Sequence, residues 1–273
     1  MLAHAPRQPG SWLTVTFGKT NFPMHHQTCL ARVLLAVVFA TCCASIQAGT
    51  VKTRESISIG DETRFYVFIR PADLEVSRAY PVLFGFHGYR GEVKTWFHDY
   101  ARFEEFAAEK RFIVVYPEAP IQWTRKSEGR DIQFFDGLMR RLKKDFTVDE
   151  KRIYVIGHSN GAAFASYLVQ ERPDVIAAAA LHSGILSPSY SKLTVPEHKA
   201  PLLVFWGEKD ELMPANSAFV KYSVADFERA GFSIELIVLP GWGHSWGGKS
   251  NQVEERILSF FDKHPLETPD DEK

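Results

Sequence analysis

The stretch IYVIGHSNG, residues 153–161, decides the fold. Its first four residues are β-branched or aromatic, and they predict a strand buried within a sheet. The alanine-rich segment after it predicts a helix, and G-x-S-x-G between the two is the pattern of a nucleophile elbow. Gly157 and Gly161 are small enough for so tight a turn, which holds Ser159 at the helix N-terminus. We therefore identify Ser159 as the candidate nucleophile. The alternative is a glycine-rich turn whose serine only caps the helix.

Apolar runs of similar length recur along the chain and alternate with amphipathic segments. The runs lie at 64–69, 82–86, 113–116, 177–181, 202–205 and 234–239; the amphipathic segments lie at 97–111, 160–172 and 216–230, with two more near Asp131 and Asn251. Asp131 is a candidate N-cap, and Asn251 with Glu254 matches a capping box. This alternation predicts an α/β fold, a mostly parallel sheet of about eight strands with helices on both faces.

The composition restricts the class of protein. The 273 residues are 45% hydrophobic, 24% charged and 13% aromatic, with a formal net charge of −1. These values exclude a disordered chain, a collagen-like repeat and a small disulfide scaffold. No run of five basic residues occurs, so nothing indicates a nucleic-acid partner. We expect residues 49–264 to form one catalytic α/β domain and residues 265–273 to form a polar C-terminal tail.

The N-terminal segment differs in kind from the rest, because residues 1–48 carry three basic side chains and no acidic one. Within it VLLAVVFA, residues 33–40, follows Arg32 and leads to small residues that end at Ala48. This pattern predicts a secretory signal cleaved after Ala48, or alternatively after Ala44. A permanent membrane span is not expected, because it needs about 20 apolar residues. We expect a secreted or periplasmic protein, and Met24 is a candidate start after an upstream extension.

The cysteines and histidines argue against a metal. All three cysteines, Cys29, Cys42 and Cys43, lie in the signal segment, so the exported chain has none. We therefore expect no structural disulfide, no thiolate nucleophile and no cysteine-bound metal. No pair of histidines stands at metal-ligand spacing with a third ligand, and we expect neither a metal nor a cofactor.

A serine nucleophile needs a base, and the base needs an acid to orient it. In a fold with this elbow the chain order is serine, acid, histidine. Two predicted strands end in suitable loops, WGEKDELMP at 206–214 and PGWGHSWGG at 240–248. His244 is the candidate base; the alternative is a loop histidine stacked between two tryptophans. Asp210 is the candidate acid.

Glu208 and Glu211 flank Asp210, and we interpret both as solvated loop charges rather than as the acid. Asp210 lies far enough beyond the strand for the chain to turn back toward the histidine.

An oxyanion hole needs two N–H donors. The residue after the nucleophile, Asn160, is one candidate, and Tyr89, which follows Gly88 at the end of a predicted strand, is the other. His87 is expected to bond within that loop. His158 occupies the variable position of the elbow, and His182 is interpreted as a satisfied core residue.

Four tryptophans lie in loops near predicted strand ends: Trp96, Trp123, Trp242 and Trp246. They are candidates for an aromatic substrate cleft, and ordinary rim packing is the alternative.

These motifs resemble the secreted polyhydroxybutyrate depolymerase and feruloyl esterase family of α/β-hydrolases. The likeness covers roughly Ser56 to Phe261 and rests on residues 86–88, 152–161, 206–214 and 241–246. The most specific of these is the last, a glycine-flanked histidine followed two residues later by tryptophan. The resemblance implies a Ser159, Asp210, His244 triad that hydrolyses carboxylic esters without a cofactor.

The chain departs from that family in three respects. Tyr89 stands where the family often has cysteine, and Ala162 stands where it often has a second glycine. The disulfides common in the family cannot form. These departures leave the acyl and alcohol groups of the substrate open, and we expect a small or oligomeric ester rather than a solid polymer.

Two other functions remain open from the sequence. One is a serine peptidase on the same fold, and the other is a catalytically silent hydrolase fold used for binding. The sequence does not indicate an oligomeric state.

Overall fold

The computed structural model describes residues 49–90, 101–126, 128–185, 194–247 and 251–267. The predicted signal segment, residues 1–48, lies outside the described residues, and so does Trp96. Over the ranges that are described, we find no helix with the length and apolarity that crossing a membrane requires.

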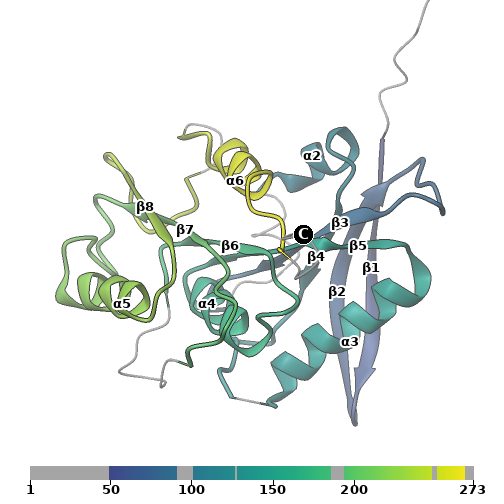
Figure 1. Cartoon of the computed structure of the whole chain (residues 1–273), viewed down its shortest axis with the longest axis horizontal. Coiled ribbons are helices and arrows are strands. Elements are labelled where there is room, and N and C mark those ends of the chain that lie inside the picture. Colours follow the sequence, from purple (N-terminus) through teal and green to yellow (C-terminus); the bar gives the residue numbers. More distant parts are fainter. Residues whose placement is uncertain (1–48, 91–100, 127, 186–193, 248–250, 268–273) are drawn as a thin grey trace, which may run out of the picture. The chain divides into compact units, whose positions relative to one another are not determined.

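The described elements alternate between strands and helices, as the sequence predicts (Figure 1). In chain order they are β1 (Thr50–Ile59), β2 (Glu62–Pro71), β3 (Tyr80–Phe86), α2 (Phe103–Glu109), β4 (Ile113–Pro117), α3 (Arg130–Asp145), β5 (Val148–His158), α4 (Asn160–Glu171), β6 (Ala178–His182), β7 (Leu202–Gly207), α5 (Ala218–Arg229), β8 (Ile234–Leu239) and α6 (Val253–Phe261).

The strands form an eight-stranded sheet in the order β1-β2-β4-β3-β5-β6-β7-β8. β1 pairs antiparallel with β2, and β2 pairs antiparallel with β4. From β4 to β8 all neighbours are parallel, so the carboxyl ends of these six strands lie at one edge of the sheet. The predicted mostly parallel sheet is confirmed. β1 escaped the sequence analysis because its TVKTRESISI pattern is polar, as suits an edge strand with mostly exposed residues.

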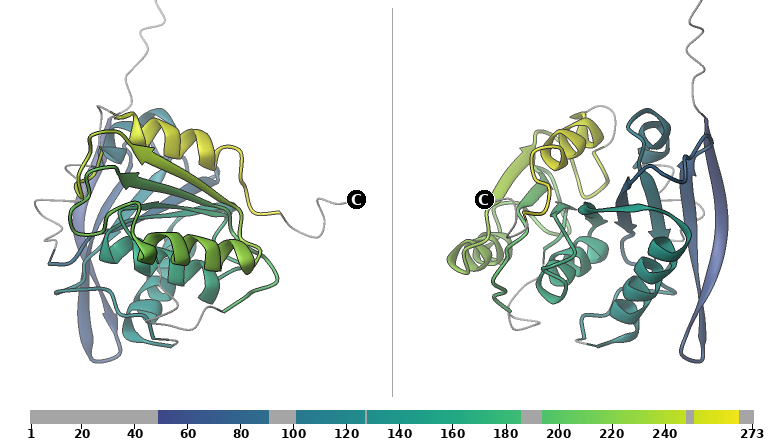
Figure 2. Two further views of the ribbon diagram at one scale, coloured as in Figure 1. Left: turned by 90° about the vertical axis from the view of Figure 1, so that its left-hand side faces the viewer. Right: turned by 45° about the vertical axis from the view of Figure 1, so that its right-hand side comes forward.

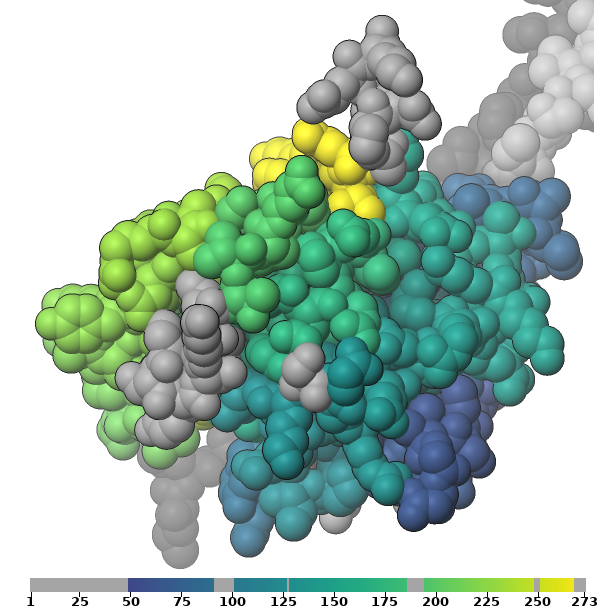
Figure 3. All heavy atoms as spheres, turned by 60° about the horizontal axis from the view of Figure 1, so that its bottom comes forward, coloured from purple at the N-terminus to yellow at the C-terminus, as the bar shows by residue number. Residues whose placement is uncertain are grey.

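Helices cover both faces of the sheet, as predicted. Side chains along a strand point alternately to opposite faces, so β3 sends Phe84 into one core and Leu83 into the other. The first core receives α3, α4 and α5, and the second receives α2 and α6. Figure 2 shows α6 (yellow) and α5 (light green) on opposite sides of the sheet. In the space-filling view of Figure 3 the turn after β1 (purple) and α5 (light green) lie at opposite sides of one face.

Two predicted helix caps are wrong. The N-cap of α3 is Gly129, and Asp131 lies inside the first turn, where it binds Arg64 and Thr124 instead. The N-cap of α6 is Gln252, and no side chain caps that helix. The carboxylate of Glu254 accepts a hydrogen bond from the indole of Trp246 rather than from a capping-box partner. In both helices a tertiary partner outcompetes the local one.

Candidate active site

The turn between β5 and α4 has the geometry of a nucleophile elbow. Ser159 adopts φ 53° and ψ −116°, a conformation that few non-glycine residues hold. Its N–H donates to the carbonyl of His182 over 2.8 Å, and its carbonyl accepts from the N–H of Ala163 over 3.1 Å. These bonds hold Ser159 in a strained backbone conformation beside the ends of β5 and β6. Strained conformations of this kind cluster at functional sites.

Three glycines make this turn possible, and each does so by lacking a side chain. A Cβ at Gly157 would lie 2.4 Å from the backbone of Gly161, and one at Gly161 would lie 2.1 Å from the carbonyl oxygen of Phe86. A Cβ at Gly184 would lie 2.2 Å from the carbonyl oxygen of Ser159. The first two were predicted from the motif. Gly184 was missed, because it approaches the serine through space and not along the chain.

The fold brings Ser159, His244 and Asp210 together into one hydrogen-bonded chain. The Nε2 atom of His244 lies 2.9 Å from the Oγ atom of Ser159, and its Nδ1 atom lies 2.8 Å from the carboxylate of Asp210. A carboxylate only accepts, so Nδ1 carries the proton and Nε2 is left to accept from the serine hydroxyl. The Asp210 side chain is fully buried, whereas that of His244 is 19% exposed.

Asp210 is also held by its own loop. Its second carboxylate oxygen accepts from the N–H groups of Leu212 (3.0 Å) and Met213 (2.8 Å). The carbonyl of Met213 in turn accepts from the indole of Trp206. The carboxylate therefore has a fixed orientation toward His244, and its negative charge is compensated although it is buried.

The loops that carry the acid and the histidine are bonded to each other. The N–H of Lys209 donates to the carbonyl of Trp242 over 2.7 Å, and the N–H of Gly241 donates to the carboxylate of Glu208 over 2.7 Å. A Cβ at Gly207 would lie 2.1 Å from the carbonyl oxygen of Gly243. Glu208 is exposed and does not contact His244, as interpreted, and its carboxylate in addition holds the histidine loop through the N–H of Gly241.

The loop after β3 lies directly beside the nucleophile. A Cβ at Gly88 would lie 3.4 Å from the Cβ of Ser159. The predicted donor Tyr89 comes next in the chain, with a ring that is 56% exposed. The other predicted donor, Asn160, begins α4, and its side-chain oxygen accepts from the N–H of Trp123. Both residues therefore flank Ser159, and their role in binding an oxyanion stays a prediction.

His87 bonds within this loop through Nδ1, as predicted, and through Nε2 to the segment that follows β4. Its Nε2 accepts from the N–H of Ala119 over 3.0 Å, so its proton is on Nδ1, which donates to the carbonyl of Gly88 over 2.7 Å. Burial lowers the pKa of His87, which keeps the ring neutral. A neutral ring is required, because a protonated Nε2 would lose the bond from Ala119.

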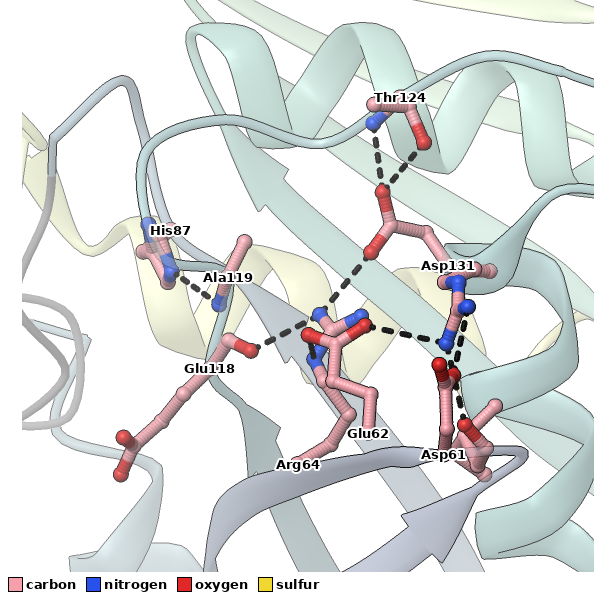
Figure 4. A network of polar contacts seen from close by, with 10 residues as sticks. Asp61, Glu62, Arg64, His87, Glu118, Ala119, Thr124 and Asp131 are labelled. Carbon is pink, nitrogen blue, oxygen red and sulfur yellow. Dashed lines mark hydrogen bonds and ion pairs between the residues drawn. The ribbon is translucent and has the colours of Figure 1, made fainter.

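A buried polar network anchors the segment that supports this loop (Figure 4). Arg64 of β2 donates to the carboxylate of Asp131 over 2.9 Å and to the carbonyl of Glu118 over 3.0 Å. The second oxygen of Asp131 accepts from the N–H and the hydroxyl of Thr124. The side chains of Arg64 and Asp131 are only 4% and 6% exposed. The network fixes both ends of the segment 118–124, which carries Trp123.

The predicted substrate-binding tryptophans differ in exposure. Trp123 is 1% exposed; its indole donates to the carbonyl of His87 and stacks on Phe164. Trp246 is 4% exposed and is bonded to Glu254. Trp242 is half-buried, and its indole donates to the carbonyl of Ser245. The burial of Trp123 and Trp246 favours the packing alternative over a role in lining a cleft, and the prediction of substrate contact stays with Trp242.

Within the described ranges, no group of three His, Cys, Asp or Glu side chains is arranged to hold a metal ion. The described part of the site thus contains a serine, an imidazole and a buried carboxylate, which together suit nucleophilic attack followed by proton transfer.

The mostly parallel sheet and the β5–α4 elbow define an α/β-hydrolase fold. Solved structures agree with this class. A ferulic acid esterase superposes with a TM-score of 0.63 at 17% identity, over 79% of this chain and 98% of that one. An acylaminoacyl peptidase from Pyrococcus horikoshii superposes with a TM-score of 0.62 at 16% identity, over 81% of this chain and 42% of that one. At such identities the likeness concerns the fold alone.

The chain belongs to the dienelactone hydrolase family, whose sequence profile matches residues 117–262, more than half of its length. Among curated proteins, feruloyl esterase B of Thermothelomyces thermophilus is 25% identical over 163 residues, which cover 55% of this chain and 53% of that protein. Feruloyl esterase B of Neurospora crassa is 25% identical over 169 residues, covering 57% and 55%. The chain thus spans about half the length of these relatives. The resemblance to feruloyl esterases is confirmed, and that to polyhydroxybutyrate depolymerases stays a prediction.

Proposed function

We propose that this protein is a serine carboxylic-ester hydrolase that acts through an acyl-enzyme. The observation that carries the proposal is the unbroken chain of contacts from the Oγ of Ser159 through His244 to the buried carboxylate of Asp210. Membership of the dienelactone hydrolase family and the feruloyl esterase relatives support ester hydrolysis.

In the first half of the reaction, the Oγ of Ser159 attacks the ester carbonyl while Nε2 of His244 accepts the hydroxyl proton. The carboxylate of Asp210 stabilises the resulting imidazolium and keeps Nε2 directed at the serine. The N–H groups of Asn160 and Tyr89 donate to the oxyanion of the tetrahedral intermediate. The intermediate then collapses, the C–O bond to the alcohol breaks, and His244 returns its proton to the leaving oxygen.

In the second half, His244 accepts a proton from a water molecule, and the hydroxide attacks the acyl carbonyl of the acyl-enzyme. The carboxylic acid leaves when the bond to Ser159 breaks and the serine oxygen regains a proton from His244. The enzyme is restored, and the net reaction is an ester plus water giving an acid plus an alcohol.

We propose a hydrophobic or aromatic acyl group for the substrate, carried on a small or oligomeric alcohol. The relatives named feruloyl esterase support a feruloyl ester, and the half-buried Trp242, which lies in the histidine loop, offers an aromatic contact.

We propose export as well, on the basis of the signal pattern in residues 1–48. The expected result is a secreted or periplasmic protein that begins at Gly49, or alternatively at Ser45, in N-terminal sequencing, and an uncleaved N-terminus in the cytoplasm would contradict it.

A serine-reactive fluorophosphonate and a panel of p-nitrophenyl and feruloyl esters test the function. We expect the wild-type protein to be labelled at Ser159 and to hydrolyse esters. Ser159→Ala should be unlabelled, with turnover lower by on the order of 10⁶-fold. Ser166→Ala is the matched control, because Ser166 is a buried serine of the same helix whose hydroxyl bonds to the carbonyl of Ala163.

Two outcomes would overturn the proposal. Cleavage of peptide anilides without ester turnover would indicate the peptidase alternative. A folded wild-type protein that the fluorophosphonate does not label would indicate a catalytically silent binding protein.

A further inference from the structure

His158, at the variable position of the elbow, is bonded to the main chain of the histidine that faces the nucleophile. Its Nε2 atom lies 2.7 Å from the carbonyl oxygen of His244. A carbonyl oxygen only accepts, so Nε2 of His158 carries a proton and donates it to this bond. The two rings lie 5.3 Å apart between centroids, at 54°. The side chain that precedes the nucleophile therefore bonds to the main chain of the candidate base.

The same ring also touches the loop on the other side of the nucleophile. A Cβ at Gly88 would lie 3.2 Å from the Nδ1 atom of His158, closer than ordinary van der Waals contact. The ring of His158 is thus enclosed between the loop that carries Tyr89 and the loop that carries His244. It is 1% exposed, so no water competes for the bond to His244.

His182 supports the far end of the same loop. It lies directly opposite His158 in the pairing of β5 with β6. Its Nε2 accepts from the N–H of Gly247 over 3.0 Å, and its ring stacks on Trp246 with 5.0 Å between centroids. Its proton is therefore on Nδ1, which donates to the hydroxyl of Ser183 over 3.1 Å. The two histidines hold opposite tautomers, and together they fasten both ends of the segment 244–247.

Both supporting histidines must be neutral for this arrangement to hold. Burial lowers the pKa of His158 to about 4 and that of His182 well below its ordinary value. The charged or titratable groups that face His158 are His182, His244 and Asp210. A cation at His158 would oppose the imidazolium that forms on His244 during the reaction, and a proton on Nε2 of His182 would remove the bond from Gly247.

We propose that His158 is a positioning residue that holds the main chain of His244 so that Nε2 of the base stays directed at Ser159. This inference rests on the proposed function. In this role the neutral ring of His158 donates one hydrogen bond, from Nε2–H to the carbonyl of His244.

The test compares His158→Phe, which keeps the ring but lacks the donor, with His158→Gln, whose amide nitrogen replaces Nε2–H. The readouts are kcat and KM for a p-nitrophenyl ester, the fluorophosphonate labelling rate, and the melting temperature. We expect His158→Phe to lower kcat and the labelling rate about 10- to 100-fold, because small misplacements of a catalytic group are costly. KM should change less than about twofold, because the substrate contacts remain. His158→Gln should recover most of the loss.

His264→Phe is the control, because His264 is a partly buried histidine beyond α6 whose ring bonds to the carbonyl of Phe260 through Nδ1. It should leave kcat unchanged. Where His158→Phe does not fold, the pair His158→Gln and His158→Asn decides instead. The shorter Asn amide does not reach the carbonyl of His244, so only Gln should keep full kcat.

The outcomes separate this inference from the proposed function. Wild-type protein that neither hydrolyses esters nor reacts with fluorophosphonate overturns the proposed function. Active wild-type protein whose His158→Phe variant matches it in kcat and labelling rate overturns the role of His158 alone. An equal loss in the Phe and Gln variants, at unchanged melting temperature, would also overturn it, because the donor would then be irrelevant.

Discussion

At the scale of single residues, the site depends on groups that can only accept or only donate hydrogen bonds. Asp210 accepts three N–H donors and is compensated by them although it is buried. Because the carboxylate only accepts hydrogen bonds, it determines that Nδ1 of His244 carries the proton. A substitution at Asp210 that places a donor opposite Nδ1 therefore changes the tautomer of His244.

Asp210→Asn tests this tautomer argument. The Asn oxygen can still accept from Leu212 and Met213, but its NH₂ group then faces Nδ1 of His244 and forces the proton onto Nε2. That atom can no longer accept from Ser159, so we expect kcat for ester hydrolysis to fall on the order of 10⁴-fold. Glu211→Gln is the control, because Glu211 is an exposed neighbouring acid. Full activity in Asp210→Asn would contradict the assigned acid.

At the scale of elements, a buried ion pair joins β2 to the first turn of α3. Arg64 lies over the ring of Phe134 at 4.4 Å and pairs with Asp131 in the first turn of α3. This pair also holds Thr124, and through it the segment that contains Trp123. A carboxylate in that first turn is favoured by the helix dipole as well.

Asp131→Ala tests the importance of this pair. The change leaves the buried guanidinium of Arg64 with only the partly exposed carboxylate of Glu62, 3.7 Å from its Nε, as a counter-charge. We expect the free energy of unfolding to fall by about 3 kcal/mol. Asp61→Ala is the matched control, because Asp61 pairs with Arg130 on the surface, where its side chain is 83% exposed. Urea unfolding of both variants gives the comparison, and an equal effect of the two changes would refute the assigned importance.

At the scale of the whole molecule, buried neutral histidines make stability depend on pH. Burial lowers the pKa values of His87, His158 and His182 in the folded protein. For His158 the pKa falls from 6.5 to about 4, so between these values the unfolded chain binds a proton that the folded protein excludes. The resulting stability is complete above about pH 6.5 and is lost as the pH falls toward about 4.

We expect the free energy of unfolding to decrease between pH 7 and about pH 4.5, by about 1.4 kcal/mol per pH unit for each excluded proton. Urea unfolding at a series of pH values measures this slope. His158→Gln removes one of the three titrating groups and should flatten it. A slope that is the same in the wild-type protein and in His158→Gln would show that His158 is not a source of the pH dependence.

The sequence by itself was sufficient for the positions of most strands along the chain, for the elbow, and for the three residues that meet there. These depend on local chemistry: buried strands need apolar runs, the tight turn needs Gly157 and Gly161, and the acid and the base follow strand ends in a set order. β1 was missed because this edge strand is half solvated and carries no apolar run, whereas the other edge strand, β8, does carry one.

Only the tertiary structure decided which partner each side chain takes. The pairing of β5 with β6 sets His158 against His182, and the meeting of two loops gives Glu208 a backbone N–H to bind. Trp123 and Trp246 became buried for the same reason. A local sequence pattern indicates whether a side chain is buried and whether it requires a hydrogen-bond partner. Which neighbour satisfies the need is determined by the register of the sheet, which joins residues far apart in the chain.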